Sequence, residues 1–474
     1  MKSMQKPIKT VVNAAVIAVM ASAANAGSFS LYTESSPAAI GNYAAGIAAE
    51  AADASTGWYN PAGLPLIRSK EAVFGAVGIF PSIKLHGLST FNTAGLPTYQ
   101  QTFDGIKTSK PGYVPSFHSA IPLGENATFG FSVVAPFGLA TQWNRQGRVR
   151  YAATTSNLLT SNFSPEIGAK LTEKFSVGAG IDLQYSRVRF NQVLGSPALM
   201  HAFGVEPSLL DSLSYNRGQS FGVGFHAGVL GMFYDNHTRV GFNYQSQVRH
   251  RFNGYSRLQG RLANLSPILT PLAVLESNPD ALYWSNSLAS NTIIFPEVAT
   301  LSLYQDVTDR FAFLASAVFT GWRSLKTLEL DRVAAYAPFP ANGQILANSV
   351  TTENYHNAWR FAIGGNYHVN EKLMMRVGGG FDQTPTRKVY RDIRVPDSNR
   401  AAASIGAHYQ ARPSLGVDIG YTRLFGIEHA KINKTAPVGS SSTYNVNAGI
   451  KSHADLVGIQ AVWTLDQPVP VTTK

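Results

Sequence analysis

The chain has 474 residues, a formal net charge of +11, only 14% charged residues, 42 glycines and no cysteine. The lack of cysteine excludes disulfides, thiolate metal sites, cysteine nucleophiles and a lipoprotein anchor. A basic balance can indicate nucleic-acid binding, but the export signal described next argues against it, and we expect the basic side chains to face anionic lipopolysaccharide or acidic substrates.

Residues 1–26 have the pattern of a cleavable signal peptide. A lysine-containing start precedes an apolar run over 11–24, and Ala24-Asn25-Ala26 forms a small-x-small cleavage site. The apolar run is too short to span a bilayer, which disfavours an N-terminal membrane anchor. We therefore expect an exported mature chain that begins at Gly27.

Residues 27–68 are expected to fold as a plug, or hatch, inside a lumen. Ser36 as N-cap and Pro37 as first helical residue predict a helix over 36–52, which is rich in alanine. Such a thin helix is poorly stable alone but fits inside a lumen. A flexible N-terminal arm is the alternative, and the few charges of the segment and its large apolar side chains disfavour it.

The most distinctive segment runs from Asp53 to Leu64, with Asn60-Pro61-Ala62 at its centre. Proline disfavours the helical region for the residue before it, so Asn60 is expected to be extended or in a turn.

From residue 70 onward the sequence alternates with a period of two, the pattern of strands with one lipid-facing and one lumen-facing side. In 240–249, for example, Phe242 and Val248 fall on the predicted lipid face and Asn243 on the lumen face. The other clear cases are 176–185, 373–382 and 414–422. Further strand candidates lie near 70–85, 113–122, 126–136, 148–153, 163–172, 219–234, 292–305, 309–321, 355–368, 401–410 and 454–464.

The fold class follows from this pattern. The mature chain has no second apolar run of about 18 residues, which excludes a transmembrane helix, so a spanning chain must close its backbone hydrogen bonds in a barrel. We predict an all-β transmembrane fold, a roughly fourteen-stranded antiparallel β-barrel over 69–465, with the helical hatch over 27–68 and a tail over 466–474. An array of soluble β-sandwiches is the alternative, disfavoured by the export signal and the even strand spacing.

Two long connections, near 191–216 and 253–291, contain many leucines. We expect long outer loops whose apolar side chains either fill a small loop core or leave an apolar collecting surface.

Several motifs occur in a fixed order. Ala52-Asp53-Ala54-Ser55-Thr56 is followed by Tyr59-Asn60-Pro61-Ala62-Gly63-Leu64, and then by Ala135–Leu139, Phe295–Glu297, Phe319–Trp322, Trp359–Gly365, Arg376–Pro385 and Val395–Arg400. This ordered set resembles the FadL/TodX (OMPP1) family of outer-membrane transporters of long-chain fatty acids and aromatic hydrocarbons. The resemblance covers essentially the whole mature chain.

The resemblance implies a fourteen-stranded barrel closed by the hatch, with Asn60, Pro61 and Ala62 as gating residues. Substrate would adsorb between the outer loops, move to a tighter lumenal site, and leave sideways through a gap made by a kinked third strand. Pro136 is the candidate for that kink, because proline removes a ladder donor. An ordinary strand terminator is the alternative for Pro136.

The resemblance also implies a location and partners. We expect a monomer in the outer membrane of a Gram-negative bacterium, with hydrophobic small molecules, outer-membrane lipid and lipopolysaccharide as partners, no nucleic acid and no cofactor. Members of the family commonly end on an aromatic residue, whereas here Leu465 is followed by the extra tail over 466–474.

Two arginines are candidates for binding a ligand carboxylate, which favours a buried or partly buried cation. Arg187 is carried over weakly from the resemblance, and Arg376 has the lumenal phase. Strict alternation puts Arg187 with Tyr185 on the lipid face, so only a bulge or an interfacial height would let it reach inward. For both arginines a solvated or interface-anchoring role is the alternative.

Other classes of outer-membrane protein remain as alternatives. A phospholipase needs Ser and His on one strand face, and Ser220 and His226 share a face. A general porin would lack the plug, and an adhesin would bind through its loops without uptake. Since no His-Glu-x-x-His motif occurs and Ser220 falls within a predicted strand, we expect no enzyme. The sequence favours uptake of hydrophobic compounds, with long-chain fatty acids ahead of aromatic hydrocarbons.

Overall fold

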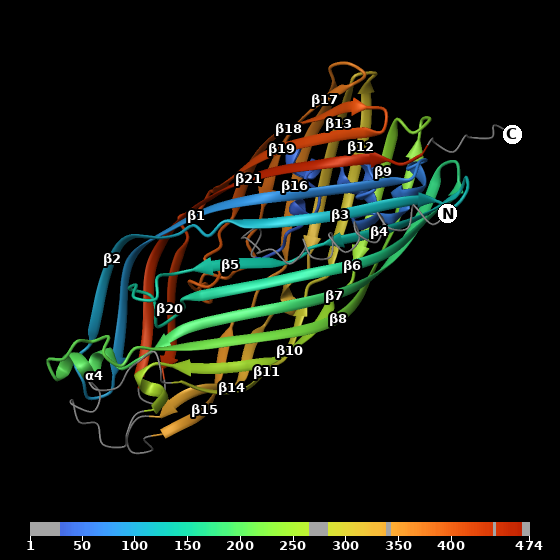
Figure 1. Cartoon of the computed structure of the whole chain (residues 1–474). Coiled ribbons are helices and arrows are strands. Elements are labelled where there is room, and N and C mark those ends of the chain that lie inside the picture. Colours follow the sequence, from blue (N-terminus) through green and yellow to red (C-terminus); the bar gives the residue numbers. More distant parts are fainter. Residues whose placement is uncertain (1–28, 265–282, 338–342, 439–441, 467–474) are drawn as a thin grey trace.

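The structure is a computed structural model that describes residues 29–264, 283–337, 343–438 and 442–466. Its strands form one antiparallel sheet that closes on itself as an elongated barrel (Figure 1). Closure is made by β1 (Glu71–Thr93) and β21 (Ser442–Thr464), which pair along their whole length from Glu71 opposite Thr464 to Thr93 opposite Ser442. The segment predicted as a signal peptide, 1–26, and most of the predicted tail, 467–474, lie outside the described residues.

The barrel has fourteen strands, as predicted, because many of its 21 strand segments continue one another. The uninterrupted strands are β1, β6 (Thr155–Thr172), β7 (Phe175–Leu194), β8 (Ser212–Phe233), β17 (Leu373–Asp382), β18 (Arg400–Arg412) and β21. The interrupted strands are β2 (Tyr99–Thr108) with β3 (Gly112–Pro122), β4 (Ala127–Val134) with β5 (Gly138–Gln142), β9 (Thr238–Gln245) with β10 (Val248–Gln259), β11 (Tyr283–Phe295) with β12 (Val298–Thr308), β13 (Phe311–Thr320) with β14 (Thr327–Ala337), β15 (Gly343–Thr352) with β16 (Ala358–His368), and β19 (Leu415–Gly426) with β20 (Lys431–Val438).

Helices are few and short. They are η1 (Thr33–Ser35), η2 (Ala38–Gly41), α2 (Ile47–Glu50), α3 (Thr56–Tyr59), η3 (Pro61–Leu66), α4 (Pro197–Ala202), η4 (Arg261–Asn264) and η5 (Trp322–Ser324). No helix among the described residues is long and apolar enough to cross a membrane.

The alternation of lipid-facing and lumen-facing side chains is confirmed on most strands. On β7, Asp182 and Gln184 are buried in the lumen while Ile181 is 54% exposed on the outside. On β19, Asp418 is buried and Ile419 is 55% exposed. The outer face therefore carries the apolar side chains, and the inner face carries polar ones that bond the hatch.

The prediction for Val248 is wrong. Phe242 is exposed as expected, but Val248 is 4% exposed and lies inside. The strand is interrupted at Ser246-Gln247, between β9 and β10, and the alternation changes face there. A period-two pattern cannot detect such a break, since one irregular residue moves every following side chain to the other face.

The segment over 36–52 is not one continuous helix. It forms two separate short helices, η2 and α2, and the chain between and after them has positive φ at Tyr43, Ala44, Gly46 and Ala51. Here the backbone bonds to the barrel wall in place of its own helix: the Gly46 N–H donates to Ser316 Oγ at 2.8 Å. The wall thus overrides the local helix propensity of the alanines.

Outside the hatch, the strands reach further than the alternation predicts. β7 extends to Leu194, β8 starts at Ser212, and β10 extends to Gln259, so they occupy much of the two segments assigned to long loops. The described part of the first connection contains α4, and the second lies partly outside the described residues. Residues 148–153 form turns and not the predicted strand.

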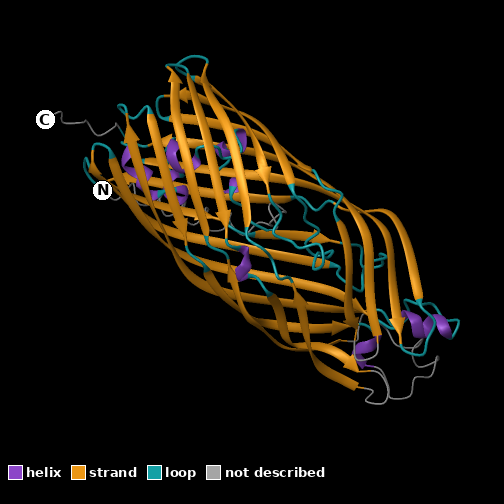
Figure 2. Cartoon of the chain, turned by 180° about the vertical axis from the view of Figure 1, so that it is seen from behind, coloured by secondary structure: helices purple, strands orange, loops and turns teal. Residues whose placement is uncertain are grey.

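The two ends of the barrel differ. At one end β8 and β9 are joined by a tight turn in which Asp235 and Asn236 have positive φ, and we call this the turn end. At the opposite end lies α4, and we call this the loop end (Figure 1). The hatch helices sit inside the barrel in the half nearer the turn end (Figure 2).

Candidate functional site in the barrel lumen

Asn60 is fully buried and ties the hatch to itself and to the wall. Its side-chain amide donates to the Ala48 carbonyl at 2.7 Å and to the Val229 carbonyl of β8 at 3.1 Å. Its side-chain oxygen accepts from the Ala62 N–H at 3.1 Å. One amide therefore bridges α2, η3 and the barrel wall, which only Asn or Gln can do because both donors and an acceptor are needed.

Glycines of the wall make room for the Asn-Pro-Ala motif. A Cβ added at Gly228 would lie 2.1 Å from Asn60 Oδ1, and one at Gly178 would lie 2.3 Å from the Pro61 carbonyl carbon. Ser176 adds a bond by donating to the Ala62 carbonyl at 2.5 Å. The motif is thus seated on β7 and β8, against positions where a side chain would clash.

The rest of the hatch is held by polar side chains that project from distant strands. Thr422 of β19 donates to the Ile40 carbonyl at 2.6 Å. Gln460 of β21 donates to Asp53 at 2.8 Å and accepts from the Ala38 N–H at 3.3 Å. These hydrogen bonds act together with apolar packing, since Leu31 and Ile40 of the hatch segment are buried in one cluster with Val77, Leu314 and Leu456 of the wall.

The barrel wall is interrupted at Pro136. β4 ends at Val134 and β5 begins at Gly138; both segments pair with β6, but among the described residues β5 has no ladder partner on its other side. The Leu31 N–H of the hatch segment donates to the Pro136 carbonyl at 2.9 Å, and the Gly138 N–H donates to the Phe29 carbonyl at 2.8 Å. The start of the hatch segment therefore takes the place of a neighbouring strand at this break.

An apolar cluster fills the lumen beside the break. Phe29 lies edge-on to Trp322, with ring centroids 4.5 Å apart, and contacts Phe295 at 6.0 Å and Phe137 at 6.1 Å. Other buried members are Leu139, Leu158, Val188, Phe252, Ile293, Leu325, Tyr355, Ala358 and Val395. We call this set the lumenal apolar cluster. It makes this part of the barrel interior apolar and suits an acyl chain or an aromatic ring.

The space left beside the hatch is small. Cavities of about 30 Å³ lie between Glu34 and Arg360 on one side and near Trp58 and Pro136 on another. A volume of about 30 Å³ holds about one water molecule, whereas ligand pockets measure hundreds of Å³. A hydrophobic ligand can enter this lumen only if the hatch or the cluster moves.

Glu34 is a buried carboxylate of the hatch next to one of these cavities. Neither of its oxygens has a hydrogen-bond partner among the described residues. Burial raises the pKa of Glu34 to about 7. Desolvation in this buried place therefore shifts the carboxyl group of Glu34 toward its neutral form.

The two candidate arginines lie in different places. Arg376 is buried in the lumen, as its phase predicts, and its guanidinium is paired with Asp418. A Cβ added at Gly41 would lie 3.4 Å from Cβ and Cδ of Arg376, so this side chain lies against the hatch. Arg187 is on the outer face of β7 with Ile181 and Tyr185, because β7 has no bulge at this height.

The phospholipase arrangement is not formed. Ser220 and His226 are six positions apart on β8, which corresponds to about 20 Å along a strand. His226 is buried and contacts Asp182 at 3.1 Å and the Gly57 carbonyl at 3.2 Å, whereas Ser220 accepts from the Arg251 N–H at 3.0 Å. His226 thus supports the hatch.

Sequence reasoning missed Phe29 and the lumenal apolar cluster. The cluster draws its members from positions as far apart as Phe29 and Val395, and no local pattern connects them. The sequence did contain a partial signal for the cluster, because Phe295, Trp322 and Phe137 all lie within the motifs that carried the family resemblance.

The family model described as "Outer membrane protein transport protein (OMPP1/FadL/TodX)" matches residues 17–465. The chain belongs to this family. It is therefore an outer-membrane transport protein and not an enzyme, in agreement with the sequence-based expectation.

Individual members of the family are distant in sequence. A long-chain fatty acid transport protein of Salmonella typhi is 27% identical over 434 residues, covering 89% of this chain and 92% of that protein. A putative outer membrane protein of Neisseria meningitidis is also 27% identical over 434 residues, covering 87% and 90%.

Solved structures show the same fold. The crystal structure of a Pseudomonas aeruginosa FadL homologue matches with a TM-score of 0.76 at 24% identity, covering 93% of this chain and 100% of that one. The Pseudomonas putida toluene transporter TodX matches with a TM-score of 0.61 at 15% identity, covering 94% and 98%.

Proposed function

We propose that this protein takes up hydrophobic compounds across the outer membrane, and that long-chain fatty acids are its main substrates. The single observation that carries the proposal is the lumenal apolar cluster, which lies directly against the break in the wall at Pro136 and above the hatch. An amphiphile that displaces Phe29 would meet apolar side chains along its chain and an unpaired strand edge beside it.

The proposed route leads sideways into the membrane. The hatch blocks the path along the barrel axis, while β5 lacks a ladder partner on one side among the described residues. An acyl chain gains about 0.8 kcal/mol per CH₂ on leaving water, so entry into lipid through the wall is favoured over release into the periplasm. Asn60, Pro61 and Ala62 are proposed as the hatch residues that gate this route, and Pro136 as the residue that keeps it open.

Neither of the two candidate arginines lies where the proposed route could use its charge to bind a carboxylate. Arg376 is already neutralised by Asp418, and Arg187 faces outward. A buried cation that lines a cavity together with the cluster members Trp322 and Ala358 is Arg360, which stacks on Tyr43 with its guanidinium carbon 3.9 Å from the ring centroid.

Aromatic hydrocarbons are the second candidate substrates. The cluster includes Phe29, Phe137, Phe295 and Trp322, whose edge-to-face arrangement suits an additional aromatic ring. We further propose that the barrel acts as a monomer, surrounded by outer-membrane lipid and lipopolysaccharide.

The test is uptake of a radiolabelled long-chain fatty acid by Gram-negative cells that lack their own transporter, with and without this protein. We expect uptake well above the empty-vector level, and competition by unlabelled fatty acid. Surface protein is quantified from the heat-modifiable band of the folded barrel. Uptake of labelled toluene in place of the fatty acid would move the assignment to aromatic hydrocarbons, and uptake of neither would contradict the proposal.

A further inference from the structure

The outer face of the barrel carries a concentration of arginines on three neighbouring strands. Its members, which we call the arginine patch, are Arg187 and Arg189 of β7, Arg217 of β8, and Arg249 and Arg251 of β10. They share their side of the wall with Phe221, which is 60% exposed. The patch is therefore on the membrane-facing surface and outside the transport route.

Strand pairing brings these like charges together. Arg189 of β7 lies directly opposite Arg217 of β8, and Arg217 lies directly opposite Tyr255 of β10. Like charges in directly opposed positions destabilise a sheet. Among the described residues neither Arg189 nor Arg217 forms an ion pair with a carboxylate, so an anion from outside would relieve this repulsion.

The arginine patch differs from other arginines of the barrel in its charge partners. Within the part of the chain that the structure describes, none of its five guanidinium groups forms an ion pair, whereas Arg423 on another part of the barrel pairs with Asp455 at 2.9 Å. Guanidinium groups without a carboxylate partner on neighbouring strands suit a multiply charged phosphate ligand, since Arg binds phosphate through two parallel hydrogen bonds.

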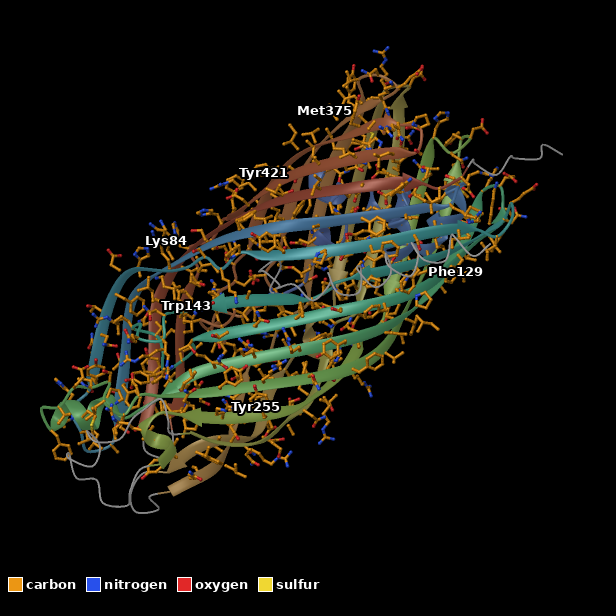
Figure 3. All side chains as sticks on the ribbon, viewed as in Figure 1. Lys84, Phe129, Trp143, Tyr255, Met375 and Tyr421 are labelled. Carbon is orange, nitrogen blue, oxygen red and sulfur yellow. The ribbon has the colours of Figure 1, made fainter. Side chains whose placement is uncertain are left out.

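Tyrosine rings contact the arginine patch and restrict its side chains. The Arg189 guanidinium lies over the Tyr215 ring, with its carbon 5.2 Å from the centroid, and Tyr215 stacks on Tyr255 at 5.7 Å. Tyr185 donates to Gln219 at 3.1 Å in the row below. Figure 3 shows Tyr255 on the outer wall in the half nearer the loop end. Stacked arginines lose less freedom when they bind, which favours phosphate recognition.

The patch sits at the edge of the apolar band. On β7 the outward side chains are apolar or tyrosine from Phe175 to Tyr185, and the next outward residue is Arg187. Ten residues of strand rise about 33 Å, which a tilt of about 40° converts to a height of about 25 Å, equal to the apolar band of an outer-membrane barrel. The arginines thus lie where the phosphates of the outer leaflet lie.

A hollow adjoins the patch. Between β8 and β10 the ladder is broken, and a surface hollow of about 740 Å³ is lined by Phe221, Arg249, Arg251 and Thr292 among others. It places the guanidinium groups of Arg249 and Arg251 beside the ring of Phe221, a combination of cation and apolar surface that suits a phosphorylated acyl lipid.

We propose that the arginine patch binds lipopolysaccharide through the phosphates of its lipid headgroup, with an acyl chain lying against Phe221 and Val223. The site flanks the transport route, because Leu159 of β6 pairs with Arg187 on one side and with Gly138 of β5 on the other. Two strand spacings, about 10 Å, separate the bound headgroup from the strand that borders the break. Bound lipid therefore fixes the height of the barrel and lines the membrane next to the lateral gap.

The test uses the full-length barrel purified in detergent, with diphosphorylated lipid A as the probe. The patch variant is Arg189→Gln/Arg217→Gln/Arg251→Gln. The matched control is Lys174→Gln/Arg310→Gln/Lys372→Gln, which removes three exposed charges near the turn end. We expect the patch variant to bind the probe at least about tenfold more weakly than wild type, and the control variant to bind within about twofold of it.

Two further arms identify the ligand and protect against misfolding. Dephosphorylated lipid A and inorganic phosphate should each bind wild type far more weakly than diphosphorylated lipid A. The variant Arg189→Lys/Arg217→Lys/Arg251→Lys keeps the charge and should retain part of the affinity. Equal binding by wild type and the Gln variant, equal binding of the dephosphorylated lipid, or inorganic phosphate that binds as tightly as the lipid would each overturn the proposal.

Discussion

At the scale of single residues, Asn60 is the most connected polar side chain of the hatch. It makes hydrogen bonds to Ala48, Val229 and Ala62 without any exposure to solvent. Asn60→Ala leaves these backbone groups unsatisfied, and we expect hatch docking to weaken by about 2–4 kcal/mol. Uptake should fall while the amount of folded barrel is unchanged, because the wall does not depend on this side chain.

The control for this prediction is Asn42→Ala in the same hatch. The Asn42 side-chain oxygen is also buried, but it has no hydrogen-bond partner among the described residues. Fatty-acid uptake and the heat-modifiable band are measured for both variants in parallel. If Asn60→Ala transports normally, the Asn-Pro-Ala motif only fills space.

At the scale of elements, the break between β4 and β5 is closed by the start of the hatch segment. Ser30 and Phe137 form an isolated antiparallel bridge there. The flanking hydrogen bonds make them a non-hydrogen-bonded pair, whose Cα atoms lie about 4.5 Å apart, within the range of a disulfide. The chain has no natural cysteine, so Ser30→Cys/Phe137→Cys gives one defined cross-link.

We expect the oxidised Ser30→Cys/Phe137→Cys variant to lose uptake and the reduced form to regain it, because the proposed lateral route needs this bridge to open. The matched control is Thr93→Cys/Ser442→Cys, which links β1 to β21 within the wall. Both single-cysteine variants are measured as well, and Phe137→Cys alone shows the effect of losing the Phe137 ring. Full uptake by the oxidised hatch variant would refute the lateral route.

At the scale of the whole molecule, barrel closure and hatch docking are separate. The ladder between β1 and β21 is continuous without the hatch, and the hatch contributes side bonds to many strands. We expect deletion of residues 28–60 to leave a folded barrel that conducts ions in a planar bilayer. The intact protein should conduct almost none, since its described cavities beside the hatch hold about one water each.

Circular dichroism of both proteins would establish the strand content, which should be the same per residue outside the deleted segment. A deletion variant that folds but conducts as little as wild type would show that the outer half of the lumen, and not the hatch, is the barrier.

The barrel fold, its fourteen strands and the face on which most strand residues lie could be predicted from the sequence alone. The reason is that lipid on one face and a polar lumen on the other impose a period of two. The buried Arg376 and exposed Ile419 follow from that period alone. The family membership was equally accessible, since its motifs are local and occur in order.

The shape of the hatch, the face of Val248 and the two clusters of distant residues became evident only from the folded chain. The hatch is broken into short helices because Ser316 and other wall residues offer its backbone better partners than a helix does. Val248 changes face because of an interruption that a regular pattern hides. The lumenal apolar cluster and the arginine patch both join residues that are distant in sequence and adjacent only through strand register, which long-range pairing sets and local periodicity does not.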